Sequence, residues 1–283
     1  MKTVKIAGVP EHFNLPWHLS IEAGEFAKAG INLQWTDVPE GTGKMCQMLR
    51  ENQTDIAVIL TEGIVKDIVG GNPSAIVQVY VESPLIWGIH VGAESDYKTL
   101  ADLENSKVAI SRYGSGSHLM AYVNAQNQKW DTQQLQFEIV NTIDGAVEAL
   151  TKGTADYFMW ERFMTKPLVD KGIFRRVADC PTPWPCFVIA VRNEFLKEHS
   201  QTVGLLLDII NTTTADFKSV PHIDRTLAAK YHQKTEDIQE WLSVTQWSQK
   251  PLEENVLNKI QNQLFDLKII EKKGTFAEIV KAV

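Results

Sequence analysis

Two stretches of the chain decide the fold: residues 38–60, VPEGTGKMCQMLRENQTDIAVIL, and residues 140–161, VNTIDGAVEALTKGTADYFMWE. Each starts at the end of a strand and passes through a loop and a helix to a leucine. An aspartate then follows at the same spacing and opens an apolar strand. The pairs are Leu49 with Asp55 and Leu150 with Asp156. A repeated order of elements predicts two similar α/β lobes.

The same alternation of strands and helices extends outward from both stretches. The pattern predicts strands at 3–9, 31–38, 55–60, 75–81, 85–91, 107–111, 135–140, 155–160, 174–178 and 186–192. It predicts helices at 17–29, 43–51, 63–69, 99–104, 117–128 and 144–151, and five more at 193–199, 201–217, 224–232, 235–244 and 252–267. Strands that alternate with helices form βαβ units. We therefore expect an α/β fold in which each lobe is a mixed, mainly parallel sheet flanked by helices.

No low-complexity linker separates the lobes. We expect strands to cross between them near 82–92 and 188–193. This places 1–88 and 190–283, with the C-terminal helices, in the first lobe. The second lobe is then 89–189.

Composition excludes several classes of function. The chain has 28 Lys and Arg against 35 Asp and Glu, a formal charge of −7, which argues against a nucleic-acid binder. No apolar stretch approaches the ~18 residues of a membrane-spanning helix, and we expect no membrane insertion. The N-terminus shows no secretory h-region, which predicts a cytoplasmic location, or a periplasmic one if a signal peptide has been removed. Three widely spaced cysteines favour buried thiols over a disulfide framework.

Candidate binding residues follow the predicted strands. In parallel α/β sheets, ligands bind beyond the carboxyl ends of the strands, where helix N-termini offer free N–H groups. In the first lobe this rule selects His12, Asn14, Thr42, Gly43, Thr61 and Glu62. In the second lobe it selects Arg112, Ser115, Gly116, Ser117, His118, Trp160 and Glu161.

The loop RYGSGSH, residues 112–118, is the most informative of these segments. Its glycines allow close approach of the backbone to a ligand, and Arg112 suits a carboxylate, sulfonate or phosphate. A plain helix cap is the alternative for this loop, and a tight turn is the alternative for Gly43. Glu62 and Glu161 either accept hydrogen bonds from a ligand or form salt bridges with basic neighbours.

Complete catalytic and metal-binding motifs are missing. No histidine pair has the spacing of H-E-x-x-H, and the G-x-S-x-G and phosphate-loop spacings are absent. We therefore expect no catalytic residue, no metal ligand and no cofactor.

The residues also carry a family resemblance along nearly the whole chain. The segments are PEHFNLPW at 10–17, FAKAGINLQWTDVPEGTGKMCQML at 26–49, TDIAVILTEGIV at 54–65, YKTLADLENSKVAIS followed by RYGSGSH at 97–118, and LTKGTADYFMWE at 150–161. These segments resemble the type 2 solute-binding proteins. The similar branch contains nitrate-, sulfonate- and taurine-binding proteins and the thiamine-pyrimidine proteins.

The resemblance implies two lobes joined by a two-strand hinge, with a small anionic or heteroaromatic ligand in the cleft and closure on binding. By position, it assigns the wall of the first lobe to Thr42, Gly43, Thr61 and Glu62. It assigns the wall of the second lobe to Arg112, Ser115, Gly116, Ser117, His118, Trp160 and Glu161. It implies a monomer, with an ABC importer permease as partner if the protein is exported.

Two departures from the family pattern affect this interpretation. Secreted members carry a signal peptide or lipobox, which this chain does not show. The segment from Cys180 to Cys186 does not reproduce the cysteine-rich iron-binding motif of the fungal pyrimidine-synthesising members. The resemblance is therefore greatest to a cytoplasmic orphan branch of the fold.

Two other functions use the same fold. The alternative is a cytoplasmic enzyme, a lyase or synthase similar to those of menaquinone or thiamine pathways, with Glu62, Glu161 and His118 as acid–base groups. A regulatory effector domain ranks lowest, because no DNA-binding helices precede Thr3.

Overall fold

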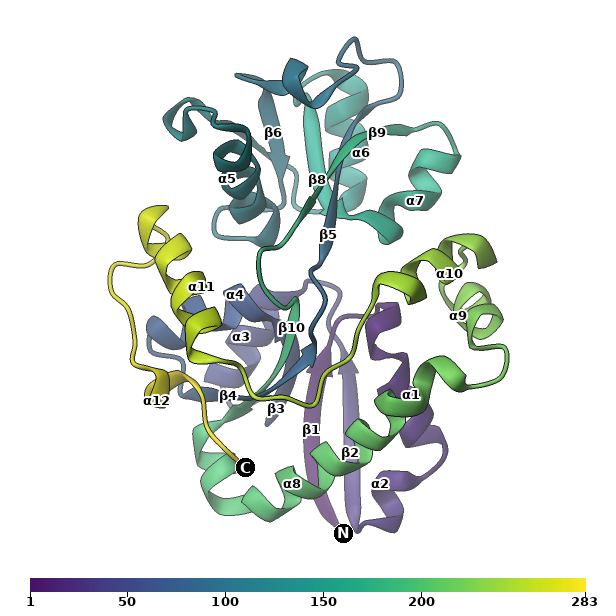
Figure 1. Cartoon of the computed structure of the whole chain (residues 1–283), viewed down its shortest axis with the longest axis vertical. Helices are drawn as coiled ribbons and strands as arrows, with labels where there is room; N and C mark the ends of the chain where they lie inside the picture. The colour runs from purple at the N-terminus through teal and green to yellow at the C-terminus, as the bar shows by residue number, and fades with distance from the viewer. The chain divides into compact units, whose positions relative to one another are not determined.

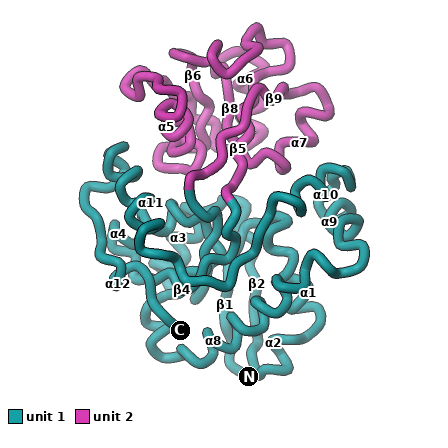
Figure 2. Tube along the Cα trace, viewed as in Figure 1, with its two compact units in different colours: residues 1–83, 184–283 teal, residues 84–183 magenta.

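The computed structural model describes residues 1–283, which divide into two compact units. Unit 1 comprises residues 1–83 and 184–283, and unit 2 comprises residues 84–183 (Figure 2). Both boundaries fall earlier in the chain than the sequence pattern places them, at 83/84 rather than 88/89 and at 183/184 rather than 189/190. No helix has the length and apolar character needed to cross a membrane.

Unit 1 contains a five-stranded mixed sheet in the order β2-β1-β3-β10-β4 (Figure 1). Its strands are β1 (Lys2–Gly8), β2 (Ile31–Asp37), β3 (Ile56–Leu60), β4 (Ser74–Val81) and β10 (Phe187–Arg192). The helices are α1 (Leu15–Glu22), α2 (Glu25–Lys28), α3 (Thr42–Arg50), α4 (Thr61–Val69), α8 (Asn193–Asp216), α9 (Ile223–Tyr231), α10 (Thr235–Val244), α11 (Glu254–Asp266) and α12 (Phe276–Ile279). Two short 3₁₀ turns, η1 (His12–Asn14) and η4 (Phe217–Ser219), complete the unit.

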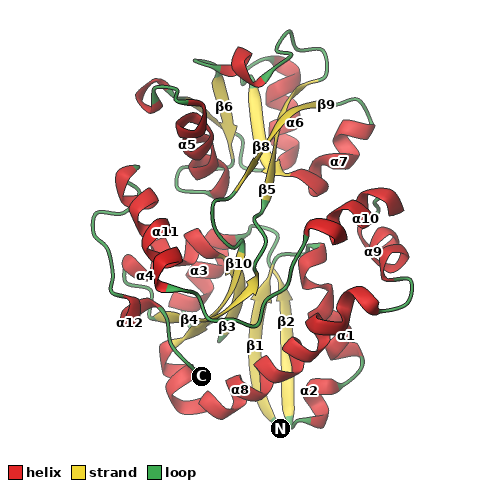
Figure 3. Cartoon of the chain, viewed as in Figure 1, coloured by secondary structure: helices red, strands yellow, loops and turns green.

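Unit 2 repeats this plan with the order β7-β6-β8-β5-β9 (Figure 3). Its strands are β5 (Ile86–Gly92), β6 (Lys107–Ile110), β7 (Gln136–Ile139), β8 (Tyr157–Glu161) and β9 (Phe174–Pro181). The helices are α5 (Gly116–Gln128), α6 (Ile143–Lys152) and α7 (Arg162–Asp170), with 3₁₀ turns η2 (Leu100–Leu103) and η3 (Thr132–Gln134).

One strand in each sheet runs against the other four. It is β10 in unit 1, antiparallel to β3 and β4, and β5 in unit 2, antiparallel to β8 and β9. Each is the first strand after the chain passes from one unit into the other. The remaining pairs, β1 with β2 and β3 and β6 with β7 and β8, are parallel. The predicted mixed, mainly parallel sheets are therefore confirmed.

The repeated aspartate has the same structural role in both units. A carboxylate oxygen of Asp55 accepts the N–H of Lys5 at 2.9 Å, and the N–H of Asp55 donates to the Lys5 carbonyl at 3.0 Å. Asp156 makes the same pair of contacts with Lys107, at 2.7 and 2.8 Å. The aspartate thus fixes the start of β3 or β8 against the neighbouring parallel strand. The spacing that revealed the repeat has a physical cause.

Burial on both faces explains why the sequences of the strands are continuous apolar runs. Ile56 to Ile59 of β3 are fully buried, and every residue of β4 is buried. Sheets covered by helices on both faces require apolar side chains on both faces of each strand. In unit 2 a cluster around Phe158 and Phe174, with Ala109 and Leu150, fills the space between sheet and helices.

Some helix boundaries differ from the sequence pattern for local reasons. The helix predicted at 17–29 is divided because Gly24 adopts φ 70°, a left-handed conformation that ends α1 and precedes α2. The helices predicted at 193–199 and 201–217 form one element, α8, with a kink at His199. The predicted cap at Thr99 is present as a capping box with Asp102.

Candidate functional site

In each unit the candidate residues lie at the edge of the sheet where the parallel strands end. In unit 1 the first residue of β10, Phe187, pairs with Leu60, the last residue of β3, and with Val81, the last residue of β4. In unit 2 the start of β5 pairs Trp87 with Glu161, the last residue of β8. The chain therefore enters and leaves each unit at the edge that carries its candidate residues.

The starts of α3 and α4 bring four candidates of unit 1 together. Thr42 is the first residue of α3, followed by exposed Gly43, and Thr61 is the first residue of α4. A Cβ on Gly63 would clash with Cγ2 of Thr42, so glycine permits this close approach of the two helices. The helix predicted to start at residue 63 begins two residues earlier, which places Thr61 and Glu62 in its first turn.

Thr61 is held by the segment that returns to unit 1. Its hydroxyl donates to the Pro185 carbonyl at 2.6 Å, and its N–H donates to the Cys186 carbonyl at 3.1 Å. The side chain is fully buried. Both polar groups of Thr61 are thus used to attach residues 185–186 to the start of α4.

Glu62 is a buried acid whose carboxyl group is only half satisfied. The side chain is 2% exposed, and Oε2 accepts the indole N–H of Trp184 at 2.8 Å. The other oxygen, Oε1, is buried and accepts no hydrogen bond. Burial raises the pKa of Glu62 to about 7, while hydrogen bonds from its own backbone N–H and from the Trp184 indole oppose the shift. The sequence did not indicate Trp184 as its partner; the only signal was a tryptophan in the loop before the returning strand.

His12 and Asn14 lie inside unit 1. His12 packs against Trp241 and Tyr231 with ring centroids 4.6 and 5.2 Å apart, and its Nε2 is 3.1 Å from the amide nitrogen of Gln233. Burial lowers its pKa to about 3, so the ring is neutral. Asn14 donates to the carbonyl of residue 9 at 2.8 Å. Both side chains are covered by their own unit, and a ligand role for them stays a prediction.

Hydroxyl groups organise the loop before α5 in unit 2. Ser115 is the N-cap and accepts the N–H of His118 at 3.3 Å. Ser117 accepts the N–H of Ser111 at 3.0 Å, and its hydroxyl lies 3.1 Å from that of Ser115. Gly116, the first residue of α5, separates the two serines. The cap predicted as an alternative for this loop is therefore present.

Arg112 and His118 flank these serines in different environments. Arg112 is exposed and forms no ion pair, which leaves its guanidinium available to an anion. Nδ1 of His118 accepts the N–H of Gly114 at 3.1 Å. The His118 ring forms T-shaped contacts with the rings of Tyr113 and Phe137, whose centroids lie 5.3 and 4.8 Å away. The histidine thus supports the shape of the loop.

Trp160 and Glu161 end β8. Trp160 is half-buried and stacks on Phe158, with ring centroids 5.5 Å apart. Glu161 is buried and caps α7 by accepting the N–H of Met164 at 2.7 Å. Leu60 occupies the corresponding N-cap position before α4 and makes no such bond.

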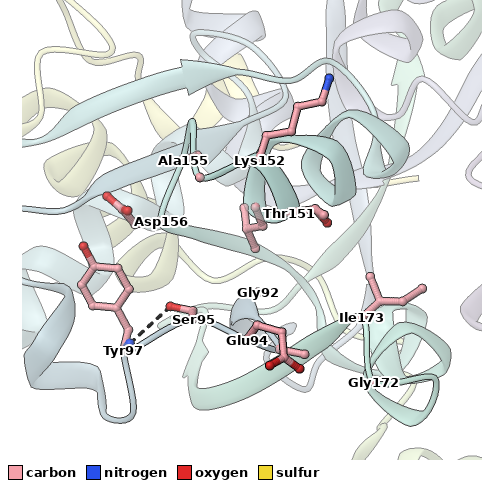
Figure 4. Close-up of a pocket in the computed structure, with 13 residues that line it drawn as sticks. Gly92, Glu94, Ser95, Tyr97, Thr151, Lys152, Ala155, Asp156, Gly172 and Ile173 are labelled. Carbon is pink, nitrogen blue, oxygen red and sulfur yellow. Dashed lines mark hydrogen bonds between the residues drawn. The ribbon is translucent and has the colours of Figure 1, made fainter.

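A pocket of about 550 Å³ lies at the opposite edge of the unit 2 sheet. Its lining includes Gly92 at the end of β5, Asp156 just before β8 and Ile173 just before β9 (Figure 4). The figure shows Tyr97 near Asp156 on one side and Thr151 near Lys152 on the α6 side. None of the predicted site residues lines this pocket. In the whole chain, no three His, Cys, Asp or Glu side chains are grouped to hold a metal ion.

Known proteins with a similar sequence or structure identify the fold. Residues 87–180 match the model of a family described as Ca3427-like PBP, a group of periplasmic binding proteins. The solved structure of the Candida albicans CA3427 gene product, described as having the generic periplasmic-binding-protein fold, is similar with a TM-score of 0.89 and 24% identity. The match covers 99% of this chain and 96% of that one. This chain has the type 2 periplasmic-binding-protein fold.

Other proteins of this fold are similar at lower identity. The alkanesulfonate-binding protein SsuA from Xanthomonas axonopodis pv. citri, bound to MOPS, has a TM-score of 0.85 and 14% identity over 100% of this chain and 99% of that chain. The nitrate-binding protein NrtA from Synechocystis PCC 6803 has a TM-score of 0.64 and 16% identity, covering 84% of this chain and 69% of that chain. No curated protein sequence matches the chain. The predicted type 2 periplasmic-binding-protein fold is confirmed.

Proposed function

We propose that this periplasmic-binding-protein-like chain is a solute-binding protein for a small anionic or heteroaromatic metabolite, with residues of both units contacting the ligand and the units closing on it. The observation that carries the proposal is the position of the candidate residues. In both units they lie at the carboxyl ends of the parallel strands, where the chain also enters and leaves. A ligand held there by both sheets favours the closed state by mass action.

Unit 2 supplies the groups suited to an anionic part of the ligand. Arg112 is exposed without an ion pair and stands just before the N-terminus of α5. Guanidinium groups and helix N-termini both favour carboxylate, sulfonate and phosphate groups. Two proteins of similar structure bind alkanesulfonate and nitrate, and these ligands are also anions. A cytoplasmic location and a link to an importer permease remain predictions.

Calorimetric titration tests this function. The compounds are nitrate, ethanesulfonate, small carboxylates and pyrimidines, added to the wild type, to Arg112→Ala and to Lys152→Ala. Lys152 is a matched control, because it is an exposed cation of unit 2 at the opposite sheet edge, paired with Glu148. We expect one anion class to bind the wild type and the control equally, and Arg112→Ala to bind it roughly tenfold more weakly, the loss of one charge-assisted contact.

Equal anion affinity of all three proteins would show that Arg112 does not contact the ligand. Absence of binding for every compound class would contradict the proposed ligand chemistry.

A further inference from the structure

The carboxyl group of Glu62 combines deep burial with an unused acceptor. Only 2% of the residue is exposed, and Oε2 receives a hydrogen bond from Trp184 at 2.8 Å. Oε1 is enclosed and receives none. A buried acceptor without a donor costs about 1–3 kcal/mol. Few such groups occur in native proteins, and each calls for an explanation.

The charge of Glu62 is also uncompensated. No ion pair of the chain involves Glu62, and the two groups that donate toward its carboxyl, its own backbone N–H and the indole N–H of Trp184, are neutral. Its place in the first turn of α4 favours an anion through the helix dipole, but this effect is small beside the cost of burying a carboxylate. A cation next to Oε1 would satisfy the acceptor and the charge together.

A purely structural role explains Glu62 less well than it explains Glu161. Glu161 is the N-cap of α7, and its carboxylate accepts the N–H of Met164. The N-cap of α4 is Leu60, so Glu62 does not cap the helix on which it lies. It stands instead at the carboxyl edge of the unit 1 sheet, beside the first turns of α3 and α4.

We propose that Glu62 is the acceptor for a cationic N–H group of the ligand, so that the ligand presents an amidinium or a protonated amino-heteroaromatic group to unit 1. This inference rests on the proposed solute-binding function and narrows its ligand class. Such a group places two or more N–H donors in one plane, and one of them reaches Oε1 while Trp184 keeps Oε2. Nitrate or an alkanesulfonate without an amino group offers no N–H donor to this oxygen.

Three aromatic probes of similar size test the proposal. Benzamidine carries the amidinium group, benzenesulfonate carries an anion, and benzyl alcohol carries neither. Their dissociation constants are measured at about pH 8. At this pH most of the Glu62 carboxyl is ionised and benzamidine is charged. The proteins are the wild type, Glu62→Gln, Trp184→Phe and Glu94→Gln. The amide oxygen of glutamine can still accept from Trp184, and Glu94 is an exposed carboxylate lining the remote pocket of unit 2.

We expect benzamidine to bind the wild type more tightly than benzyl alcohol does. Glu62→Gln should weaken benzamidine binding by about tenfold to hundredfold, the range of a charge-assisted hydrogen bond, because an amide N–H₂ then faces the cation. Glu94→Gln should leave it unchanged. Trp184→Phe retains the carboxylate and should keep benzamidine affinity within about threefold. This variant provides a second test if Glu62→Gln does not fold.

The inference is overturned if benzamidine does not bind, or if it binds the wild type and Glu62→Gln equally. Where Glu62→Gln does not fold, loss of benzamidine binding by folded Trp184→Phe overturns it. Benzenesulfonate binding that depends on Arg112 would in any of these cases leave the proposed solute-binding function intact, so the two failures are distinguishable.

Discussion

The indole N–H of Trp184 donates to Oε2 of Glu62 at 2.8 Å, although the two residues lie far apart in sequence. Trp184 is the first residue after the chain returns to unit 1, and Glu62 is in the first turn of α4. Thr61 binds the next two residues, Pro185 and Cys186, through its hydroxyl and its N–H. The returning segment is thus fixed to the candidate binding edge by three hydrogen bonds.

Removal of the Trp184 hydrogen bond should destabilise the protein. Trp184→Phe leaves Oε2 of Glu62 without its indole donor, and we expect a loss of about 1–3 kcal/mol beyond the cost of the smaller ring. Urea denaturation followed by far-UV circular dichroism measures this loss. Trp241→Phe is the matched control, because Trp241 is also fully buried in unit 1 and its indole N–H makes no hydrogen bond. Equal losses in the two variants would show that the Trp184 bond contributes nothing.

Stability should depend on pH through Glu62. Its pKa is raised to about 7 in the folded protein, so the folded state retains a proton that the unfolded state releases above its lower, ordinary pKa. Stability therefore falls as pH rises from about 4.5 to about 7, by up to ~1.4 kcal/mol per unit, and levels off above. Glu62→Gln cannot ionise and should lack this slope.

Denaturation of both proteins at a series of pH values isolates the effect of Glu62. Burial also raises the pKa of Glu11 to about 7, but Glu11 is present in both proteins and cancels in the difference. A difference in unfolding free energy that does not change with pH would show that Glu62 titrates normally.

The repeated aspartates should contribute to stability in a similar way. Asp156→Ala removes the acceptor for the Lys107 N–H, and we expect a loss of about 1.5–3 kcal/mol, the value of a hydrogen bond to a charged group. Asp55→Ala should cost more, because Asp55 also pairs with Arg192 at 3.2 Å. Asparagine retains one acceptor and should recover part of each loss. Thermal unfolding of the four variants compares them, and a neutral Asp156→Ala would contradict this role.

The approach of α3 to α4 depends on Gly63. Gly63→Ala would place a methyl group against Cγ2 of Thr42, and overpacking of this kind costs about 1–3 kcal/mol. Thr42→Ser removes that methyl group while it keeps the hydroxyl. The double variant should therefore recover most of the stability lost in Gly63→Ala. Additive effects in this double-mutant cycle would exclude the contact as the cause.

The sequence predicted the parts of the fold that depend on local pattern. The spacing from Leu49 to Asp55 and from Leu150 to Asp156 revealed the repeat, because each aspartate begins a strand that pairs in parallel with its neighbour. The antiparallel pairing of β10 and β5 could not be predicted in the same way, since it depends on where the chain returns. The break at Gly24 depends on one backbone angle.

The candidate residues were predicted by position and not by their partners. Thr61 and Glu62 lie at the expected sheet edge, but their contacts come from Pro185 and Trp184, which are 124 and 122 residues away in the sequence. His12 is enclosed by Trp241 of α10, which no local pattern indicates. Strand ends can be found in a sequence, whereas the side chains that pack over them depend on the tertiary fold.

Native mass spectrometry tests whether a ligand binds at the carboxyl edges of both sheets. The wild type and the double variant Glu62→Gln/Arg112→Ala are exposed to the same small-molecule extract of the producing cells, desalted and compared. We expect one stoichiometric small-molecule adduct on the wild type and its loss from the folded double variant. An identical adduct on both proteins, or no adduct on the wild type, would contradict this expectation.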